Sequence, residues 1–115
     1  MQIGVEQRGP WTVIGLNGEL DGEASPSVYL RFQRELVHGR NHVLFDLSQV
    51  GFVDSKGLGM LVRCFKDARS RGGDVGLQRV PAPIERVLEF TRLDSIFAIC
   101  GDDPPPVHGS DIEAA

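Results

Sequence analysis

Between residues 43 and 68 the apolar side chains change from a continuous run to a helical repeat, and this change constrains the fold of the chain strongly. Residues 42–47 form a compact apolar run, which is typical of a strand covered on both faces. After the junction at Asp54 and Ser55, apolar residues recur at intervals of one helical turn: Leu58, Leu61, Val62, Phe65 and Ala68. The pattern predicts a strand that leads directly into an amphipathic helix, which ends near residues 71–73.

Similar patterns predict the element order ββαβαβαβ over residues 3–100. Residues 3–7 and 11–16 are expected to form a hairpin around the turn at residues 8–10. Ser25 is expected to cap a helix that has Pro26 in its first turn and ends at Gly39. Residues 74–80 predict a strand, a third helix follows Pro81 and runs to Thr91, and residues 96–100 predict a last strand. This alternation indicates an α/β fold with helices packed on a mixed, mostly parallel sheet.

Length and composition indicate one soluble globular domain. The chain has 115 residues, of which 41% are hydrophobic and 24% charged, so it can bury an ordinary core without a disulfide or a metal. Cys64 and Cys100 stand in apolar contexts and are interpreted as core residues, which is a better supported reading than a disulfide. The first residues lack the pattern of a secretory signal, and no apolar run is long enough to span a membrane, so we expect a cytoplasmic protein without a membrane partner.

The negative charge of the chain is concentrated at its C-terminal end. The net charge is −4, and residues 101–115 hold four acids without a Lys or Arg, so the remaining chain is neutral overall. Because nucleic-acid binding depends on clustered cations, we expect no nucleic-acid partner. We expect residues 1–100 to form the domain and the acidic, proline-containing residues 101–115 to be a disordered tail.

The residue types that catalysis or metal binding requires do not occur at suitable spacings. We find no Ser-His-acid set, paired carboxylates, phosphate-binding glycine loop or metal motif. His38, His42 and His108 are scattered, and neither cysteine accompanies them. We therefore expect a binding module that is not an enzyme and has no catalytic residues, cofactor or metal.

The junction before the second helix has the features of a modifiable site. A hydroxyl at Ser55 would lie beside backbone N–H groups that have no partner within the helix, an environment that favours an added phosphate. Asp54 or Ser55 can cap this helix, while Gly57 and Gly59 would let a partner approach the backbone closely. An Asp-Ser pair before a helix is often only a cap, and this reading is compatible with a regulatory serine.

Four segments together resemble the STAS domain of bacterial anti-sigma factor antagonists. They are residues 18–21 (Gly-Glu-Leu-Asp), 46–48 (Asp-Leu-Ser), 54–59 (Asp-Ser-Lys-Gly-Leu-Gly) and 91–97 (Thr-Arg-Leu-Asp-Ser-Ile-Phe), and the resemblance covers residues 3–100. The resemblance implies a cytoplasmic regulator that, when unphosphorylated, binds an anti-sigma factor serine kinase and frees a sigma factor. Phosphorylation of Ser55 would reverse this binding, and a phosphatase acting on Ser55 is a further candidate partner.

The resemblance also implies a partner-binding surface. It consists of the loop residue Asp21, the junction residues Asp54, Lys56, Gly57, Leu58 and Gly59, and Arg63 on the following helix. Lys56 stands where the family often has Ser or Thr, a departure that bears on the identity of the partner and the kinase.

Two features of this surface have a second interpretation. Asp21 is either a partner contact or a turn residue, and the basic residues Lys56, Arg63, Lys66, Arg69 and Arg71 form either a docking face or a solvated helix surface. For the whole chain, the alternatives are a STAS accessory subunit of a membrane transporter or lipid-trafficking complex, and a scaffold subunit of a stress-sensing assembly.

Overall fold

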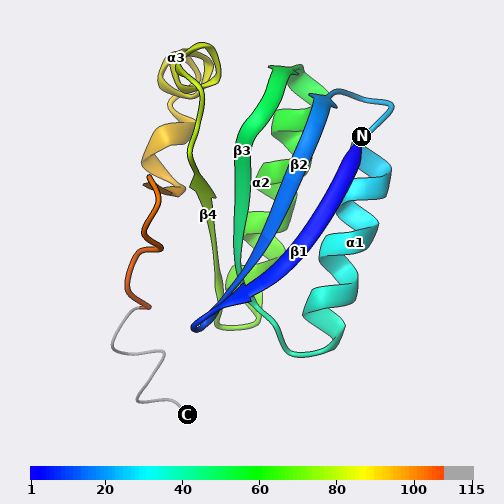
Figure 1. Ribbon diagram of the computed structural model, residues 1–115, viewed down its shortest axis with the longest axis vertical. Helices are drawn as coiled ribbons and strands as arrows, with labels where there is room; N and C mark the ends of the chain where they lie inside the picture. Colours follow the sequence, from blue (N-terminus) through cyan, green and yellow to red (C-terminus); the bar gives the residue numbers. More distant parts are fainter. Residues whose placement is uncertain (108–115) are drawn as a thin grey trace.

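The computed structural model describes residues 1–107, which form a five-stranded sheet with helices packed on it (Figure 1). The strands are β1 (Gln2–Arg8), β2 (Trp11–Leu20), β3 (His42–Val53), β4 (Asp74–Gln78) and β5 (Ala98–Cys100). The helices are α1 (Ser25–Val37), α2 (Ser55–Ser70) and α3 (Ala82–Phe90), followed by the short 3-10 helix η1 (Leu93–Ser95). The predicted order ββαβαβαβ is confirmed, with η1 as an addition.

The sheet has the strand order β1-β2-β3-β4-β5, so each strand lies beside its neighbour in the sequence. β1 pairs antiparallel with β2, and all other pairs are parallel. Successive right-handed crossovers that proceed in one direction place their helices on one face, and α1 and α2 accordingly lie together behind the sheet (Figure 1). The predicted mixed sheet is confirmed.

Successive side chains of a strand point to opposite faces of the sheet, and the apolar ones form a cluster on each face. The main core lies between the sheet and the helices and includes Phe32, Phe45 and Leu61, which are at most 1% exposed. A smaller cluster of Trp11, Val13 and Leu44 lies on the helix-free face. Trp11 is buried, Cys64 is buried as predicted, Cys100 is partly buried, and neither cysteine forms a disulfide. Burial raises the pKa of the Cys64 thiol, which keeps it protonated and unreactive.

β2 and β3 continue well beyond their predicted ends at residues 16 and 47. β4 stops at Gln78 opposite Asp46, so the later residues of β2 and β3 pair with each other, with register shifts between Gly15 and Asn17 and between Gly18 and Glu19. These irregularities and the exposed polar residues of the extension hide the strand pattern in the sequence. The extension leaves Leu20 opposite Val53, so the loops that follow the two strands are neighbours.

The predicted cap of α1 is wrong. Ala24 occupies the cap position without a side-chain hydrogen bond, while the hydroxyl of the buried Ser25 donates to the Asp21 carbonyl oxygen at 2.6 Å. The carboxylate of Asp21 instead accepts the N–H groups of Glu23 and Ala24 at 3.1 and 2.9 Å. Asp21 therefore closes the turn that precedes α1, and no side chain caps the helix itself. Gly39, with φ +80°, ends this helical segment as predicted.

Two features of the C-terminal part were not predicted. β4 ends at Gln78 and not at residue 80, because Arg79 adopts a left-handed conformation with φ +50° that turns the chain. In residues 101–107, part of the segment expected to be a disordered tail, the Pro105 carbonyl oxygen accepts a hydrogen bond from Trp11 Nε1 at 2.7 Å and Val107 packs on the helix-free cluster. Residues 108–115, including His108, lie outside the described residues.

Candidate functional site

Asp54 joins the two loops that follow β2 and β3. Its Oδ1 accepts the Gly57 N–H at 2.8 Å, which caps α2, and its Oδ2 accepts the Gly22 N–H at 3.0 Å. The backbone N–H of Asp54 donates to the Leu20 carbonyl oxygen at 3.3 Å. The predicted cap is therefore present at Asp54, and one carboxylate holds the Asp21 loop against the start of α2.

These hydrogen bonds favour the ionised form of Asp54. The Gly57 N–H has the largest effect in lowering the pKa of Asp54 below its usual value of 3.8, with the Gly22 N–H and the charge of Lys56 acting in the same direction. Ionised Asp54 therefore stabilises the fold above its unfolded-state pKa, and this contribution is lost as the pH falls through the folded-state value.

Replacing Asp54 with alanine is expected to lower the urea midpoint at pH 7 by more than at pH 3. At pH 7 the variant lacks the ionised acceptor of two backbone N–H groups, whereas near pH 3 wild-type Asp54 is losing this contribution itself. Urea unfolding of both proteins at the two pH values tests this. Asp103→Ala, at an exposed position, is the control and should leave the midpoint nearly unchanged. If the difference in urea midpoint between the wild type and Asp54→Ala were equal at both pH values, ionised Asp54 would not be the stabilising form.

Ser55 is the first residue of α2 and is exposed. Among residues 1–107, no hydrogen bond engages its hydroxyl. The N–H groups of the first helical turn are directed toward this end of α2, and Asp54 accepts one of them. The hydroxyl is therefore accessible to another molecule and lies at the partly positive end of a helix.

The two glycines of the motif have different surroundings. A Cβ at Gly57 would lie 2.1 Å from the Leu20 carbonyl oxygen, whereas a Cβ at Gly59 would meet no atom within 4 Å. Gly57 therefore permits close packing of α2 on the end of β2, which differs from the expected approach of a partner. Leu58 is also buried in the core, so Gly57 and Leu58 support this surface from within, while Gly59 is exposed on it.

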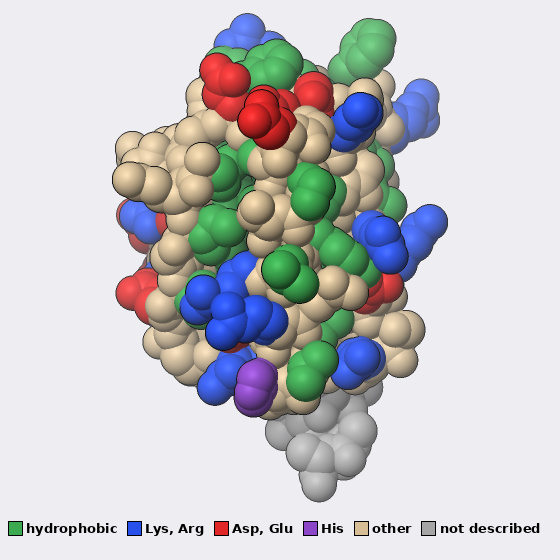
Figure 2. All heavy atoms as spheres, turned by 90° about the vertical axis from the view of Figure 1, so that its right-hand side faces the viewer, with side chains coloured by type: hydrophobic (Ala, Val, Ile, Leu, Met, Phe, Trp, Pro, Cys, Tyr) green, Lys and Arg blue, Asp and Glu red, His purple; other side chains and the backbone are tan. Residues whose placement is uncertain are grey.

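Asp21 stands in the loop beside this junction, and its carboxylate closes the turn that precedes α1, as its interpretation as a turn residue expects. Together with Glu19 and Glu23 it lines a shallow acidic depression. Figure 2 shows acidic side chains gathered at one end of the face that carries α1, with hydrophobic side chains along the middle of this face. The surface around the junction thus has an acidic margin on the side of the Asp21 loop.

A groove between α1 and α2 begins at the junction. It has a volume of about 580 Å³, and its walls include Tyr29 and Leu30 from α1 and Lys56, Gly59, Met60 and Arg63 from α2. The guanidinium of Arg63 lies 4.4 Å from the centre of the Tyr29 ring, and the Tyr29 hydroxyl donates to Asp67. Burial, followed by this hydrogen bond, raises the pKa of Tyr29 and keeps its hydroxyl protonated. The groove is apolar with cations at its rim.

The structure assigns different environments to the basic residues of α2. Lys56 lies over the backbone of Gly22, because a Cβ at Gly22 would be 2.6 Å from Lys56 Cδ. Arg69 is 3.9 Å from Asp74, and Arg71 donates to the Leu36 carbonyl oxygen at 3.4 Å. Arg69 and Arg71 therefore serve the fold, which favours a structural and solvated role for the far end of α2. Lys56 and Arg63 alone among the five line the groove at the junction.

The α1 side of the groove was not predicted from the sequence. Leu30 is 61% exposed, although it belongs to a helix that buries Val28, Phe32 and Leu36. In the sequence, the position of Leu30 outside the helical repeat of the buried residues could have indicated an exposed apolar surface. Gly22 was also missed, because its role depends on contacts with Asp54 and Lys56 that are distant in the sequence.

Residues 1–107 contain no group of three or more His, Cys, Asp or Glu side chains arranged to hold a metal ion. None of the helices in this part combines the length and apolar character that crossing a membrane requires.

Comparison with known proteins identifies the family of this fold. The model of the STAS domain matches residues 2–104. The chain belongs to the STAS domain family. The predicted resemblance is therefore confirmed for the family, and the helix start with its exposed serine is part of a STAS domain.

Relatives with described roles cover most of the chain. The Anti-sigma F factor antagonist of Paenibacillus polymyxa is 28% identical over 100 residues, 86% of each chain. The Anti-sigma-B factor antagonist of Listeria monocytogenes is 32% identical over 82 residues, 71% of this chain and 72% of the relative. Among solved structures, the crystal structure of the Thermotoga maritima protein TM1081 superposes with a TM-score of 0.80. The superposition covers 97% of this chain and 92% of that chain, and the two sequences are 27% identical.

Proposed function

We propose that this protein is an anti-sigma factor antagonist that acts as a phosphorylation switch at Ser55. In its unphosphorylated form it binds an anti-sigma factor serine kinase and so frees a sigma factor. The observation that carries the proposal is the exposed hydroxyl of Ser55 at the start of α2, next to a loop that Asp54 holds in place. The names of the Paenibacillus and Listeria relatives support the antagonist role. The protein itself is a substrate and a binding partner, not an enzyme.

The partner surface that we propose is smaller than the predicted set. It comprises Ser55, Lys56 and Gly59 at the start of α2, Arg63 further along that helix, and the Asp21 loop. Leu30 and Met60 add apolar side chains to the lining of the groove. Because Gly57 and Leu58 are buried, they contribute by positioning α2. A surface with a central apolar groove and a charged rim fits the composition of protein interfaces.

A phosphate on Ser55 would act mainly on the partner. It adds about −1.5 to −2 charges at the end of a helix that favours an anion, while the neighbouring Asp54 opposes it. These effects are of similar size in solvent, so the domain itself should change little. An interface packed on Ser55 would have to desolvate the dianion, which is costly. The switch therefore blocks an interaction and does not refold the domain.

The proposal is tested by incubating the protein with anti-sigma factor serine kinases from the same genome and ATP. Mass spectrometry should locate a single phosphate on Ser55, and Ser55→Ala should take up none. Ser27→Ala, an exposed serine in the first turn of α1, is the matched control and should be phosphorylated as well as the wild type. Phosphate at another residue, or binding of these kinases to neither form, would refute the proposal.

A further inference from the structure

Residues 101–107, which we call the C-terminal strap, lie across the helix-free face of the sheet. Arg8 Nη1 donates to the Asp102 carbonyl oxygen at 3.0 Å, and Trp11 Nε1 donates to the Pro105 carbonyl oxygen at 2.7 Å. Val107 packs against the cluster of Trp11, Val13 and Leu44, which are at most 4% exposed. The strap thus covers an apolar patch and satisfies the indole N–H of Trp11.

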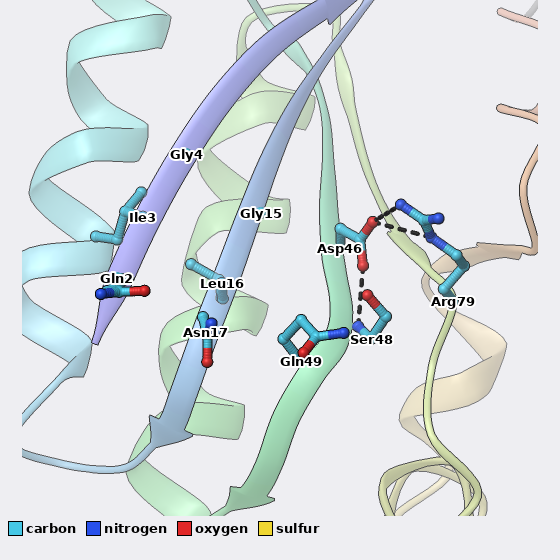
Figure 3. Close-up of a pocket in the computed structure, with 10 residues that line it drawn as sticks. All are labelled: Gln2, Ile3, Gly4, Gly15, Leu16, Asn17, Asp46, Ser48, Gln49 and Arg79. Atoms are coloured by element: carbon cyan, nitrogen blue, oxygen red, sulfur yellow. Dashed lines mark hydrogen bonds and ion pairs between the residues drawn. The ribbon is translucent and has the colours of Figure 1, made fainter.

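Arg79 links the strap to a buried carboxylate. The carboxylate of Asp46 accepts hydrogen bonds from Arg79 Nε at 3.0 Å and from the Ser48 N–H at 2.9 Å (Figure 3). The Nη1 atom of the same guanidinium lies 3.7 Å from Asp102 Oδ1 in the strap. Arg79 has φ +50°, a strained value for a residue other than glycine. Asp46 therefore orients Arg79 so that one edge of its guanidinium meets an acidic side chain of the strap.

A hollow of about 480 Å³ continues along the same face beyond Arg79. Its polar lining includes Gln2, Asn17, Ser48 and Gln49, and Gly4 and Gly15 line it further along β1 and β2 (Figure 3). None of the strap residues lines this hollow. The chain reaches Asp102 from β5, which lies at the other edge of the sheet, so the strap fills one part of the face and leaves the hollow open.

We propose that the helix-free face is a second protein-binding site, which takes an extended acidic segment containing proline, and that the strap occupies this site in cis. The contacts of the strap define this chemistry. Arg8 and Arg79 meet an aspartate, Trp11 donates to the carbonyl oxygen of a proline, and the apolar cluster takes a valine. Proline-rich segments are already extended and lack backbone donors, and they commonly dock against aromatic side chains.

The strap is suited to displacement by a partner. Its ion pair is exposed, since the Asp102 side chain is 86% accessible, and exposed ion pairs hold weakly. A partner segment that continues past the position of Asp102 would also contact the polar hollow, which the strap does not reach. The site lies at the beginning of β2 and β3, whereas Ser55 follows the end of β3. The two surfaces can therefore be occupied independently, and this proposal does not depend on the function proposed for Ser55.

Trp11 is the only tryptophan of the chain, so its fluorescence reports the site directly. In the full-length chain, the double substitution Asp102→Asn and Val107→Asp should release the strap, shift the Trp11 emission to the red and increase quenching by iodide. Asp103→Asn, at the exposed neighbouring position, is the control and should leave the emission unchanged. Unchanged emission in the double variant would overturn the assignment of the strap as a cover.

The binding site is tested by adding the synthetic peptide Gly-Asp-Asp-Pro-Pro-Pro-Val, which corresponds to residues 101–107, to this double variant. Saturable recovery of the blue-shifted emission is expected, with weaker apparent binding to the wild type because the strap competes. A peptide with Asn in place of the first Asp should bind about two- to fivefold more weakly, and one with Asn in place of the second Asp should bind equally. If the double variant does not fold, Asp102→Asn alone is titrated. Absence of saturable binding, or equal binding of a scrambled peptide, would overturn the proposal.

Discussion

Replacing Gly57 with alanine is expected to lower the free energy of unfolding by about 2 to 3 kcal/mol. The new Cβ would lie 2.1 Å from the carbonyl oxygen of Leu20, and both groups belong to backbone that cannot rotate away. The start of α2 would have to move from the end of β2, which would also strain the hydrogen bonds of Asp54 to both loops. The variant should therefore lose partner affinity as well as stability.

The matched control for this substitution is Gly59→Ala on the same helix. Its Cβ would meet no atom within 4 Å, so replacing a helical glycine there should raise stability by up to about 1 kcal/mol. Urea unfolding of the two variants measures the difference. If Gly57→Ala were as stable as Gly59→Ala, close packing between α2 and β2 would not be the reason for a glycine at position 57.

Phosphorylation of Ser55 is expected to weaken binding to the anti-sigma factor several hundredfold, whereas the thermal stability of the domain should change little. An interface that packs on Ser55 would have to desolvate the phosphate dianion. A cost of only about 3 to 4 kcal/mol in binding free energy is enough to produce this effect. The change in stability should stay within about 1 kcal/mol, because the helix end favours the phosphate while Asp54 opposes it. Isothermal titration of both forms and thermal unfolding measure the two quantities.

Two variants refine the Ser55 prediction. Ser55→Asp introduces a single charge and should weaken binding less than the phosphate does, and Ser95→Asp, at an exposed serine of η1, should bind like the wild type. A phosphorylated protein that still binds the anti-sigma factor with its original affinity would show that Ser55 lies outside the interface. Equal losses for Ser55→Asp and Ser95→Asp would instead point to a general effect of negative charge.

The sequence predicted local structure well where one face of an element is continuously buried. The apolar repeat of α2 and the run at residues 42–47 were enough to place a strand and a helix on either side of Asp54 and Ser55. The prediction failed where pairing partners decide the structure, as in the extensions of β2 and β3, whose polar residues remain exposed while their backbones pair with each other. The contacts of the first residues of the tail were not predicted either, because their partners Arg8, Trp11 and Arg79 are all more than 20 residues away in the sequence.

What the sequence by itself determined is the order of elements, the family and the serine at a helix start, because these depend on hydrophobic period and on a short motif. Only the tertiary structure decided that Asp54 holds the Asp21 loop, that Gly57 packs on Leu20 and that Leu30 faces a groove with Arg63 at its rim. Such contacts join residues that the chain brings together only when the sheet forms. Their geometry depends on strand register and helix packing, and neither can be obtained from the spacing of residues along one segment.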